Sequence, residues 1–362
     1  MKRVDATPKT VLAPAQSKAM VDTFIMPLLS QLTEDARRIS PHYETLWQDI
    51  QHLYGSGGKR LRSYMTFLTY EAFSHQAPET IIPAAAAQEL LHTAMLIHDD
   101  VIDRDAIRYG VKNIASQYSD HYEELIDNPE DRQHYANSAA MLAGDLLISQ
   151  AFILMTETKI DPALIIQSQR LLSKAIFRVV GGELLDTEAA FRGADAANPL
   201  VIAEQKTASY SFATPLVMGA TLALANPMQL TILEKLGEEL GIAYQLRDDL
   251  LGVFGNSKKT GKSSDGDIKE GKRTLLIEAF HTLATAHQKA EFMHLFGKHT
   301  ATDEQIRRVK SLLYESGAKS TVEQQIDAYQ EHAHLLLDTL DVDPQYYAAY
   351  SYLIDLCVKR ES

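Results

Sequence analysis

The stretch LLHTAMLIHDDVIDRD, residues 90–105, joins an apolar helical segment to an acidic end. Apolar residues recur there at spacings of three and four, as in a helix that buries one face. Asp99 and Asp103 follow four residues apart, so both carboxylates project from one face. Like charges at this spacing repel, and the negative end of a helix increases the repulsion. The stretch therefore predicts a buried helix that carries something positive at its end.

A second stretch, YQLRDDLLGVFG at residues 244–255, repeats the pattern with Asp248 and Asp249. For either cluster alone, a solvated helix end is as good an explanation as a binding site. For two such clusters on very apolar helices, that explanation is weaker. The two ends could flank one cavity and bind a diphosphate. Ligands that are all carboxylate oxygens favour a hard cation, and a few carboxylates suit Mg²⁺, which keeps its waters and bridges to phosphate.

Helical spacing of apolar residues continues along almost the whole chain, and the alternating β-branched runs typical of strands are missing. The predicted fold class is all-α, with a flexible N-terminal tail over residues 1–17 and one large multi-helix domain over residues 18–362. The expected helices cover residues 18–40, 63–74, 83–103, 135–158, 162–191, 200–225, 228–254, 274–295, 303–316, 321–340 and 343–358.

Composition excludes several classes of protein. With 362 residues, 45% of them hydrophobic, the chain can bury a sizeable core, which excludes a disordered or fibrous protein. The net charge of −13 opposes general attraction to nucleic acid or anionic lipid. The single cysteine, Cys357, can form neither an intrachain disulfide nor a zinc site. We expect a cytoplasmic protein, with no targeting segment and no run that approaches the ~20 apolar residues of a membrane-spanning helix.

Basic residues occur where a diphosphate site would need them. The loop GSGGKRLR, residues 55–62, places Lys59, Arg60 and Arg62 after glycines that let the backbone approach an anion. It is not a P-loop, because the GxxxxGK[ST] spacing is absent. His92 lies about two turns before Asp99 on the same face, although a lone histidine there is more often a core residue. The Lys206-Thr207 pair and Lys272 add cations that, singly, are typical of a solvated surface.

Taken together, these motifs closely resemble those of the trans-prenyl diphosphate synthases. The resemblance rests on DDVID, RDDLLGVFG, GGKRLR, Lys206-Thr207 and TGKSSDGDIKEGKRT, which occur in the family's order. It extends from about residue 18 to the final helix. It implies an isoprenoid synthase fold, which is an α-helical bundle around a central cavity, and a head-to-tail condensation of isopentenyl diphosphate with an allylic diphosphate. It also implies a homodimer.

The resemblance carries roles to matching residues. Asp99 and Asp103, assisted by Asp100, and Asp248, supported by Asp249, resemble ligands of magnesium ions, usually three, with Mn²⁺ as a substitute. The family's contacts to the allylic diphosphate match Arg108, Lys206 and Lys272, and its isopentenyl diphosphate pocket matches Lys59, Arg62 and His92. Thr207 and Gln245 correspond to positions near the leaving group and the developing cation. No side chain is assigned as general base, because the released diphosphate could remove the final proton.

The chain departs from the family pattern at several positions. Tyr109 stands where a second arginine usually follows the first motif, and Gly252 replaces the third aspartate of the second motif. Asn256 replaces another aspartate, and Glu183 stands where many relatives have glutamine. The segment 119–133 is longer and more acidic than usual and is expected to be a surface loop.

Product length is expected to depend on the residues before Asp99. Family members that make fifteen carbons carry aromatic residues four and five positions earlier, where this chain has Met95 and Ala94. Alanine leaves space and methionine is only a partial obstruction. We expect a product of at least twenty carbons, with Leu91 as the next floor of the tunnel.

Other functions fit part of the pattern. A terpene cyclase or a head-to-head condensing enzyme would share the acidic pair but would not need the GGKRLR pocket. A non-catalytic or regulatory subunit of a heteromeric synthase is the main alternative, favoured by Tyr109 and Gly252 and opposed by the intact DDVID motif. A purely structural bundle with incidental acidic ends is the simplest alternative.

Overall fold

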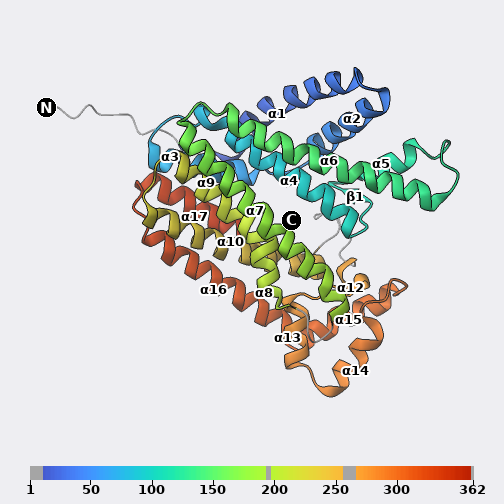
Figure 1. Ribbon diagram of the computed structural model, residues 1–362. Coiled ribbons are helices and arrows are strands. Elements are labelled where there is room, and N and C mark those ends of the chain that lie inside the picture. Colours follow the sequence, from blue (N-terminus) through green and yellow to red (C-terminus); the bar gives the residue numbers. More distant parts are fainter. Residues whose placement is uncertain (1–10, 193–196, 256–265, 360–362) are drawn as a thin grey trace. The chain divides into compact units, whose positions relative to one another are not determined.

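The computed structural model describes residues 11–192, 197–255 and 266–359, and most of them are helical (Figure 1). The strands within these ranges are β1 (Ile107–Arg108) and β2 (Val111–Lys112), an antiparallel pair with Ile107 opposite Lys112. The prediction of an all-α fold is therefore confirmed.

Contacts along the backbone divide the chain into two compact units. The first comprises Met1–Gln169, Pro215–Asn226 and Val342–Ala349, and the second comprises Arg170–Thr214, Pro227–Asp341 and Tyr350–Ser362. Helices α7 (Pro162–Arg192) and α17 (Pro344–Val358) contribute to both. One domain over residues 18–362 stays a prediction.

The first unit is built around α4 (Ile82–Ile102), which carries the first acidic motif at its end. Helix α4 packs against α6 (Pro129–Glu157), which runs beside it in Figure 1. Residues Ala84–Ala87 are fully buried, and their small side chains let neighbouring helices approach closely. The other helices of this unit are α1 (Pro14–Arg37), α2 (Pro41–Ser56), α3 (Leu61–Ser74), η1 (Pro78–Ile81), α5 (Ile114–His121) and most of α9 (Thr214–Leu222).

The second unit is built around α10 (Pro227–Phe254), which carries the second acidic motif. It packs against η3 (Ala203–Ala213), a π-helix, and against α16 (Ala318–Asp338). A Cβ on Gly241 would lie only 2.3 Å from the Cα of Ala208, so glycine is what allows α10 to approach η3. The remaining helices are α8 (Pro199–Ile202), α12 (Gly266–Glu270), α13 (Leu275–Leu283), α14 (Ala286–Leu295) and α15 (Asp303–Glu315).

Several helix boundaries differ from those predicted. Helix α6 begins at Pro129, six residues before the expected start, because the Asn128 side chain accepts a hydrogen bond from the Glu130 N–H at 2.9 Å and caps the helix. The expected helix over 274–295 is two helices, since Thr285 starts α14 with a capping box. Helix α1 begins at Pro14, inside the expected tail, whose residues 1–10 lie outside the described ranges.

The expectation that no stretch is apolar enough to span a membrane was wrong. Two helical stretches are long and apolar enough to span a membrane by length and hydropathy alone: Pro78–Ile102 and Pro129–Glu157. The first is two-thirds buried within its most apolar window, because α4 is the core helix of its unit. In α4 the apolar content reflects packing inside its unit, since a helix that is apolar all round is buried. In Pro129–Glu157 only 44% of the corresponding window is buried.

Candidate functional site

The first acidic motif lies at the C-terminal end of α4. The Asp103 N–H donates to the Asp99 carbonyl at 2.8 Å, which completes one helical turn between the two residues. The Asp99 side chain is half-buried and that of Asp103 is exposed. The structure thus places two carboxylates one turn apart at the end of a buried helix, as the sequence predicts. A donor set of carboxylate oxygens fits a hard divalent cation.

Arg108 and Asp100 form a buried ion pair beside this motif. The Asp100 side chain is 3% exposed and accepts hydrogen bonds from both Nε, at 2.7 Å, and an NH2 group of Arg108. The same guanidinium lies 3.3 Å from Asp99 and 3.5 Å from Asp105. Burial raises the pKa of Asp100 to about 6, although the Arg108 charge opposes the shift. Burial alone would lower the pKa of Arg108, but the surrounding aspartates raise it.

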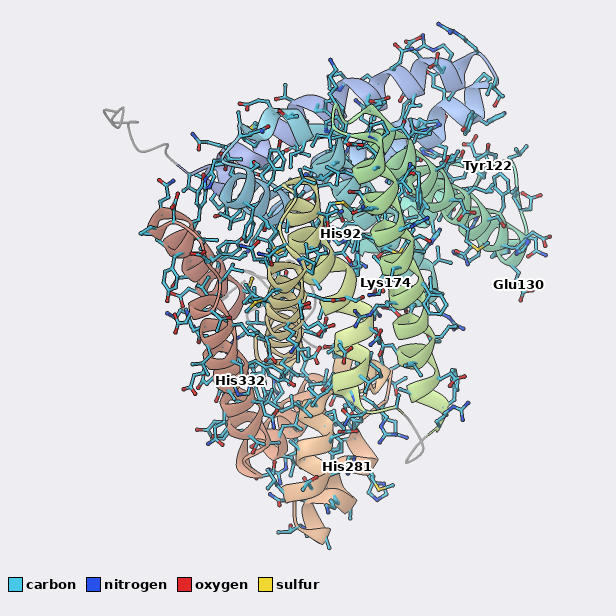
Figure 2. All side chains as sticks on the ribbon, turned by 60° about the vertical axis from the view of Figure 1, so that its left-hand side comes forward. His92, Tyr122, Glu130, Lys174, His281 and His332 are labelled. Atoms are coloured by element: carbon cyan, nitrogen blue, oxygen red, sulfur yellow. The ribbon has the colours of Figure 1, made fainter. Side chains whose placement is uncertain are left out.

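Arginines of the same unit lie close to His92. His92 is half-buried (labelled in Figure 2), and burial together with the charges of Arg62 and Arg108 holds its pKa well below the ordinary value. Burial also raises the pKa of Tyr109, and the positive charges of Arg62 and Arg108 partly oppose this increase. Since these charge effects act over short distances, Arg62, His92, Arg108 and Tyr109 lie in one neighbourhood, and Lys59 is exposed on the adjoining loop.

Arg60 has a structural role in the GGKRLR loop. Its guanidinium donates to Asp22 at 2.8 Å, to the Gly57 carbonyl at 2.8 Å and to the Tyr54 carbonyl at 2.7 Å, and it lies over the Tyr54 ring. These contacts leave its side chain 6% exposed. Arg60 therefore fixes the loop that presents its two basic neighbours, Lys59 and Arg62.

The second acidic motif is linked to η3 through a glutamine. Thr207 Oγ1 donates to Gln245 Oε1 at 2.7 Å, and Gln245 Nε2 donates to Asp249 Oδ1 at 2.8 Å. Burial raises the pKa of Asp249 to about 7, opposed by the charge of Lys272. Asp248, the other member of the motif, is exposed. The structure thus brings together Thr207, Gln245 and Asp249 through these two hydrogen bonds.

Two lysines of this unit, Lys206 and Lys272, lie close to carboxylates. Lys206 Nζ lies 2.7 Å from Asp186 and 2.9 Å from Glu183. Burial alone would lower the pKa of Lys272, but the charge of Asp267, followed by that of Asp186, raises it. Sequence reasoning missed Asp186 and Asp267. Asp186 follows Glu183 by three residues in GGELLD, which places both on the same helical face. This spacing could have indicated that Asp186 lies near the same lysine as Glu183.

A π-helix carries Lys206 and Thr207. It was not predicted, because the extra residue per turn leaves no distinct sequence period, although π-turns often occur at functional sites. A Cβ on Gly182 would lie 2.4 Å from the Lys206 backbone nitrogen. The second glycine of GGELLD therefore allows α7 to lie against the backbone that carries Lys206.

The three residues expected to control product length lie on α4. Leu91 and Ala94 are buried and Met95 is half-buried. Their role stays a prediction, as does each ligand and substrate assignment above. Asn256 and the first six residues of TGKSSDGDIKEGKRT lie outside the described residues.

Comparison with known proteins finds likenesses over most of the chain. The family model for polyprenyl synthetase matches residues 43–313. A geranylfarnesyl diphosphate synthase from Aeropyrum pernix is 31% identical over 348 residues, which cover 94% of this chain and 99% of that one. A short chain isoprenyl diphosphate synthase from Methanocaldococcus jannaschii is 30% identical over 288 residues, 79% of this chain and 81% of that one.

Solved structures show the same likeness. A crystal structure of geranylgeranyl pyrophosphate synthase from Corynebacterium glutamicum, complexed with isoprenyl diphosphate and magnesium, superimposes with a TM-score of 0.87. It is 27% identical, and the match covers 96% of this chain and 98% of that one. The residues that the family model matches, 43–313, include both acidic motifs.

Proposed function

Because this chain belongs to the polyprenyl synthetase family, we propose that it is a trans-prenyltransferase that condenses isopentenyl diphosphate with an allylic diphosphate. This is the reaction class that the motifs predict, and the family membership confirms it. The observation that carries the proposal is the retention of DDVID, RDD and GGKRLR within the match over residues 43–313.

The acidic residues are proposed to bind magnesium. Asp99 and Asp103, with Asp100 in support, and Asp248, with Asp249, would be the protein ligands, with three Mg²⁺ ions when substrate is bound and Mn²⁺ as a substitute. Bound divalent metal would neutralise charge on the leaving diphosphate. The donor chemistry supports this, since the first motif offers carboxylate oxygens at the end of α4 and the second offers them near the end of α10, inside the helix. Asp100, which is bonded to Arg108, would act by orienting that arginine.

The cationic side chains are proposed to stabilise the diphosphate groups. Breaking the allylic C–O bond leaves negative charge on diphosphate, and Lys206, Lys272 and Arg108 are the residues proposed to stabilise it. In the structure each of these cations is balanced by carboxylates, so diphosphate would compete for the same charges. Lys59, Arg62 and His92 would bind isopentenyl diphosphate. The nearby positive charges favour neutral His92, which can donate one hydrogen bond.

The proposed product has twenty carbons or more. The residues proposed to set its length are Leu91, Ala94 and Met95, among which Ala94 offers the least obstruction. The similar protein from Aeropyrum pernix is named a geranylfarnesyl diphosphate synthase, and the similar structure from Corynebacterium glutamicum is named a geranylgeranyl pyrophosphate synthase. These names support a product in this range.

A homodimer in the cytoplasm is the proposed assembly. Helix α7 exposes Phe177, Leu184 and Phe191, at 81%, 63% and 84% of their surfaces, and α6 exposes Met141 and Leu142. Large apolar side chains in such number on long helices are typical of surfaces that a second subunit covers.

The experiment that tests the proposal uses the purified chain alone with isopentenyl diphosphate, farnesyl diphosphate and Mg²⁺. Release of diphosphate together with a prenyl product of twenty or more carbons supports it. A correctly folded chain that forms no product would contradict it and favour the alternative, a non-catalytic or regulatory subunit of a heteromeric synthase.

A further inference from the structure

Gly252 and Asp267 are in direct contact in the second unit. A Cβ on Gly252 would lie 2.3 Å from Oδ2 and 3.2 Å from Cγ of Asp267. Real Cβ atoms essentially never come that close to another heavy atom. A side chain at position 252 of α10 would therefore force the Asp267 carboxylate out of its present position.

Asp267 is held in place by α12 and the turn that follows it. The Lys272 N–H donates to the Asp267 carbonyl at 3.0 Å, which closes the turn. Ile268, the next residue, is 1% exposed, and its carbonyl accepts a hydrogen bond from the Gly297 N–H at 2.9 Å. The position of the Asp267 side chain against Gly252 is therefore set by a backbone that is anchored on both sides.

Asp267 also provides the strongest charge interaction of Lys272. Its carboxylate contributes more than any other charged group to raising the pKa of the Lys272 ammonium, ahead of Asp186 and Asp249. Lys206, a second cation nearby, acts in the opposite direction. Without a nearby anion, the half-buried Lys272 ammonium would be repelled by the second cation.

We infer that Asp267 is a positioning residue that takes the space left by the missing third aspartate of the second motif and holds the Lys272 ammonium for diphosphate binding. The inference rests on the proposed function, since it assumes that Lys272 binds the allylic diphosphate. The inference also explains why position 252 is glycine. In this chain Asp267 on α12 supplies the carboxylate, and a side chain at position 252 of α10 would displace it.

Restoring the family residue should therefore harm the enzyme. In Gly252→Asp, two carboxylates would compete for one position next to Asp249, and Asp267 would be pushed away from Lys272. In the exchange variant Gly252→Asp/Asp267→Ala, the number of carboxylates is that of the parent and the clash is removed.

The test compares Gly252→Asp, the exchange variant and Asp267→Asn with the parent. Calorimetric titration measures the Kd of inorganic diphosphate with Mg²⁺, steady-state kinetics give KM and kcat for farnesyl diphosphate, and a melting curve reports folding. We expect Asp267→Asn to raise Kd and KM on the order of tenfold, because the negative charge nearest in effect to the Lys272 ammonium is removed, at an unchanged melting temperature. Gly252→Asp should lose at least as much, and the exchange variant should recover most of that loss.

Two results would overturn the inference: a parent-like diphosphate Kd in Asp267→Asn, or an exchange variant no better than Gly252→Asp. Lys272→Ala separates the inference from the proposed function. If this variant binds diphosphate weakly while Asp267→Asn binds normally, only the role of Asp267 is wrong. If Lys272→Ala binds as the parent does, the proposed role of Lys272 is wrong, and the inference is overturned with it.

Discussion

Gln245 connects Thr207 to Asp249 by using both ends of its amide: Oε1 accepts from the threonine hydroxyl at 2.7 Å and Nε2 donates to the carboxylate at 2.8 Å. A single side chain thus joins the π-helix η3 to the acidic end of α10. Because the donor and the acceptor lie at fixed ends of the amide, the orientation of all three groups is defined together.

Removing this amide should lower the rate of reaction. In Gln245→Leu, of similar size, the buried Asp249 carboxylate loses its donor and Thr207 loses its acceptor. An unsatisfied buried group costs roughly 1–3 kcal/mol, so kcat should fall about tenfold or more. The measurement is kcat with both substrates saturating, and the melting temperature is the control for folding. A parent-like kcat would show that the link has no part in the reaction.

Tyr109 should contribute one neutral hydrogen bond to isopentenyl diphosphate. It occupies the left-handed region at φ 54°, in the two-residue turn between β1 and β2, and its ring packs so closely on Gly57 that a Cβ there would lie 2.6 Å from the ring. Tyr109→Phe keeps the ring and removes only the hydroxyl. We expect KM for isopentenyl diphosphate to rise about threefold to tenfold, the value of a neutral hydrogen bond, with KM for farnesyl diphosphate unchanged.

The matched variant Tyr109→Arg restores the charge that the family usually has there. Because a charge-assisted hydrogen bond is roughly twice as strong as a neutral one, KM for isopentenyl diphosphate should fall below that of the parent. If Tyr109→Phe and Tyr109→Arg both leave this KM unchanged, position 109 does not contact the substrate.

His92 should make the fold less stable in mild acid. Its pKa in the folded protein lies well below the ordinary 6.5, so the unfolded chain takes up a proton as pH falls through 6.5 while the folded chain does not. The stabilisation by neutral His92 is therefore complete above pH 6.5 and decreases below it. His92→Gln should show a smaller loss of unfolding free energy between pH 7.5 and 5.5, measured by urea denaturation. Equal losses in the two proteins would contradict this.

Ala94→Phe should shorten the product. Ala94 is fully buried on α4, so a phenyl ring there would either block the path of the prenyl chain or force repacking, which costs about 1–3 kcal/mol. The product of the variant, formed from isopentenyl and farnesyl diphosphates, is identified by mass spectrometry. If the variant is folded and its product is as long as that of the parent, the floor of the tunnel lies elsewhere.

Much of the fold was accessible from the sequence because long helices have a strong apolar period. Helix α2 (Pro41–Ser56) was missed, although its signals were present: Ser40 caps it by accepting from the Tyr43 N–H at 3.1 Å, Pro41 follows, and Leu46, Ile50 and Leu53 are buried at helical spacing. The stretch 200–225 was predicted as one helix and is α8, η3 and α9 in succession. The close approach of α10 and α7 to η3, which the glycines permit, is a tertiary effect that local pattern does not encode.

For the site, residue types were predictable and their pairing was not. The family motifs predict that Lys206, Lys272 and Arg108 contact diphosphate. Their neighbours Asp186, Asp267 and Asp100 could not be predicted, because they depend on which helix faces meet. The departure at Gly252 looked like a loss in the sequence. Only the coordinates show that the carboxylate of Asp267 lies against it.

The most direct test of the whole account is the rate of diphosphate release by Asp99→Ala, measured beside the parent with isopentenyl and farnesyl diphosphates in Mg²⁺ and after addition of EDTA. Loss of a metal ligand should remove several kcal/mol of transition-state stabilisation, so we predict a rate at least ~1,000-fold lower in the variant and an equally inactive parent in EDTA. Parent-like turnover by Asp99→Ala, or turnover that continues in EDTA, would contradict the account.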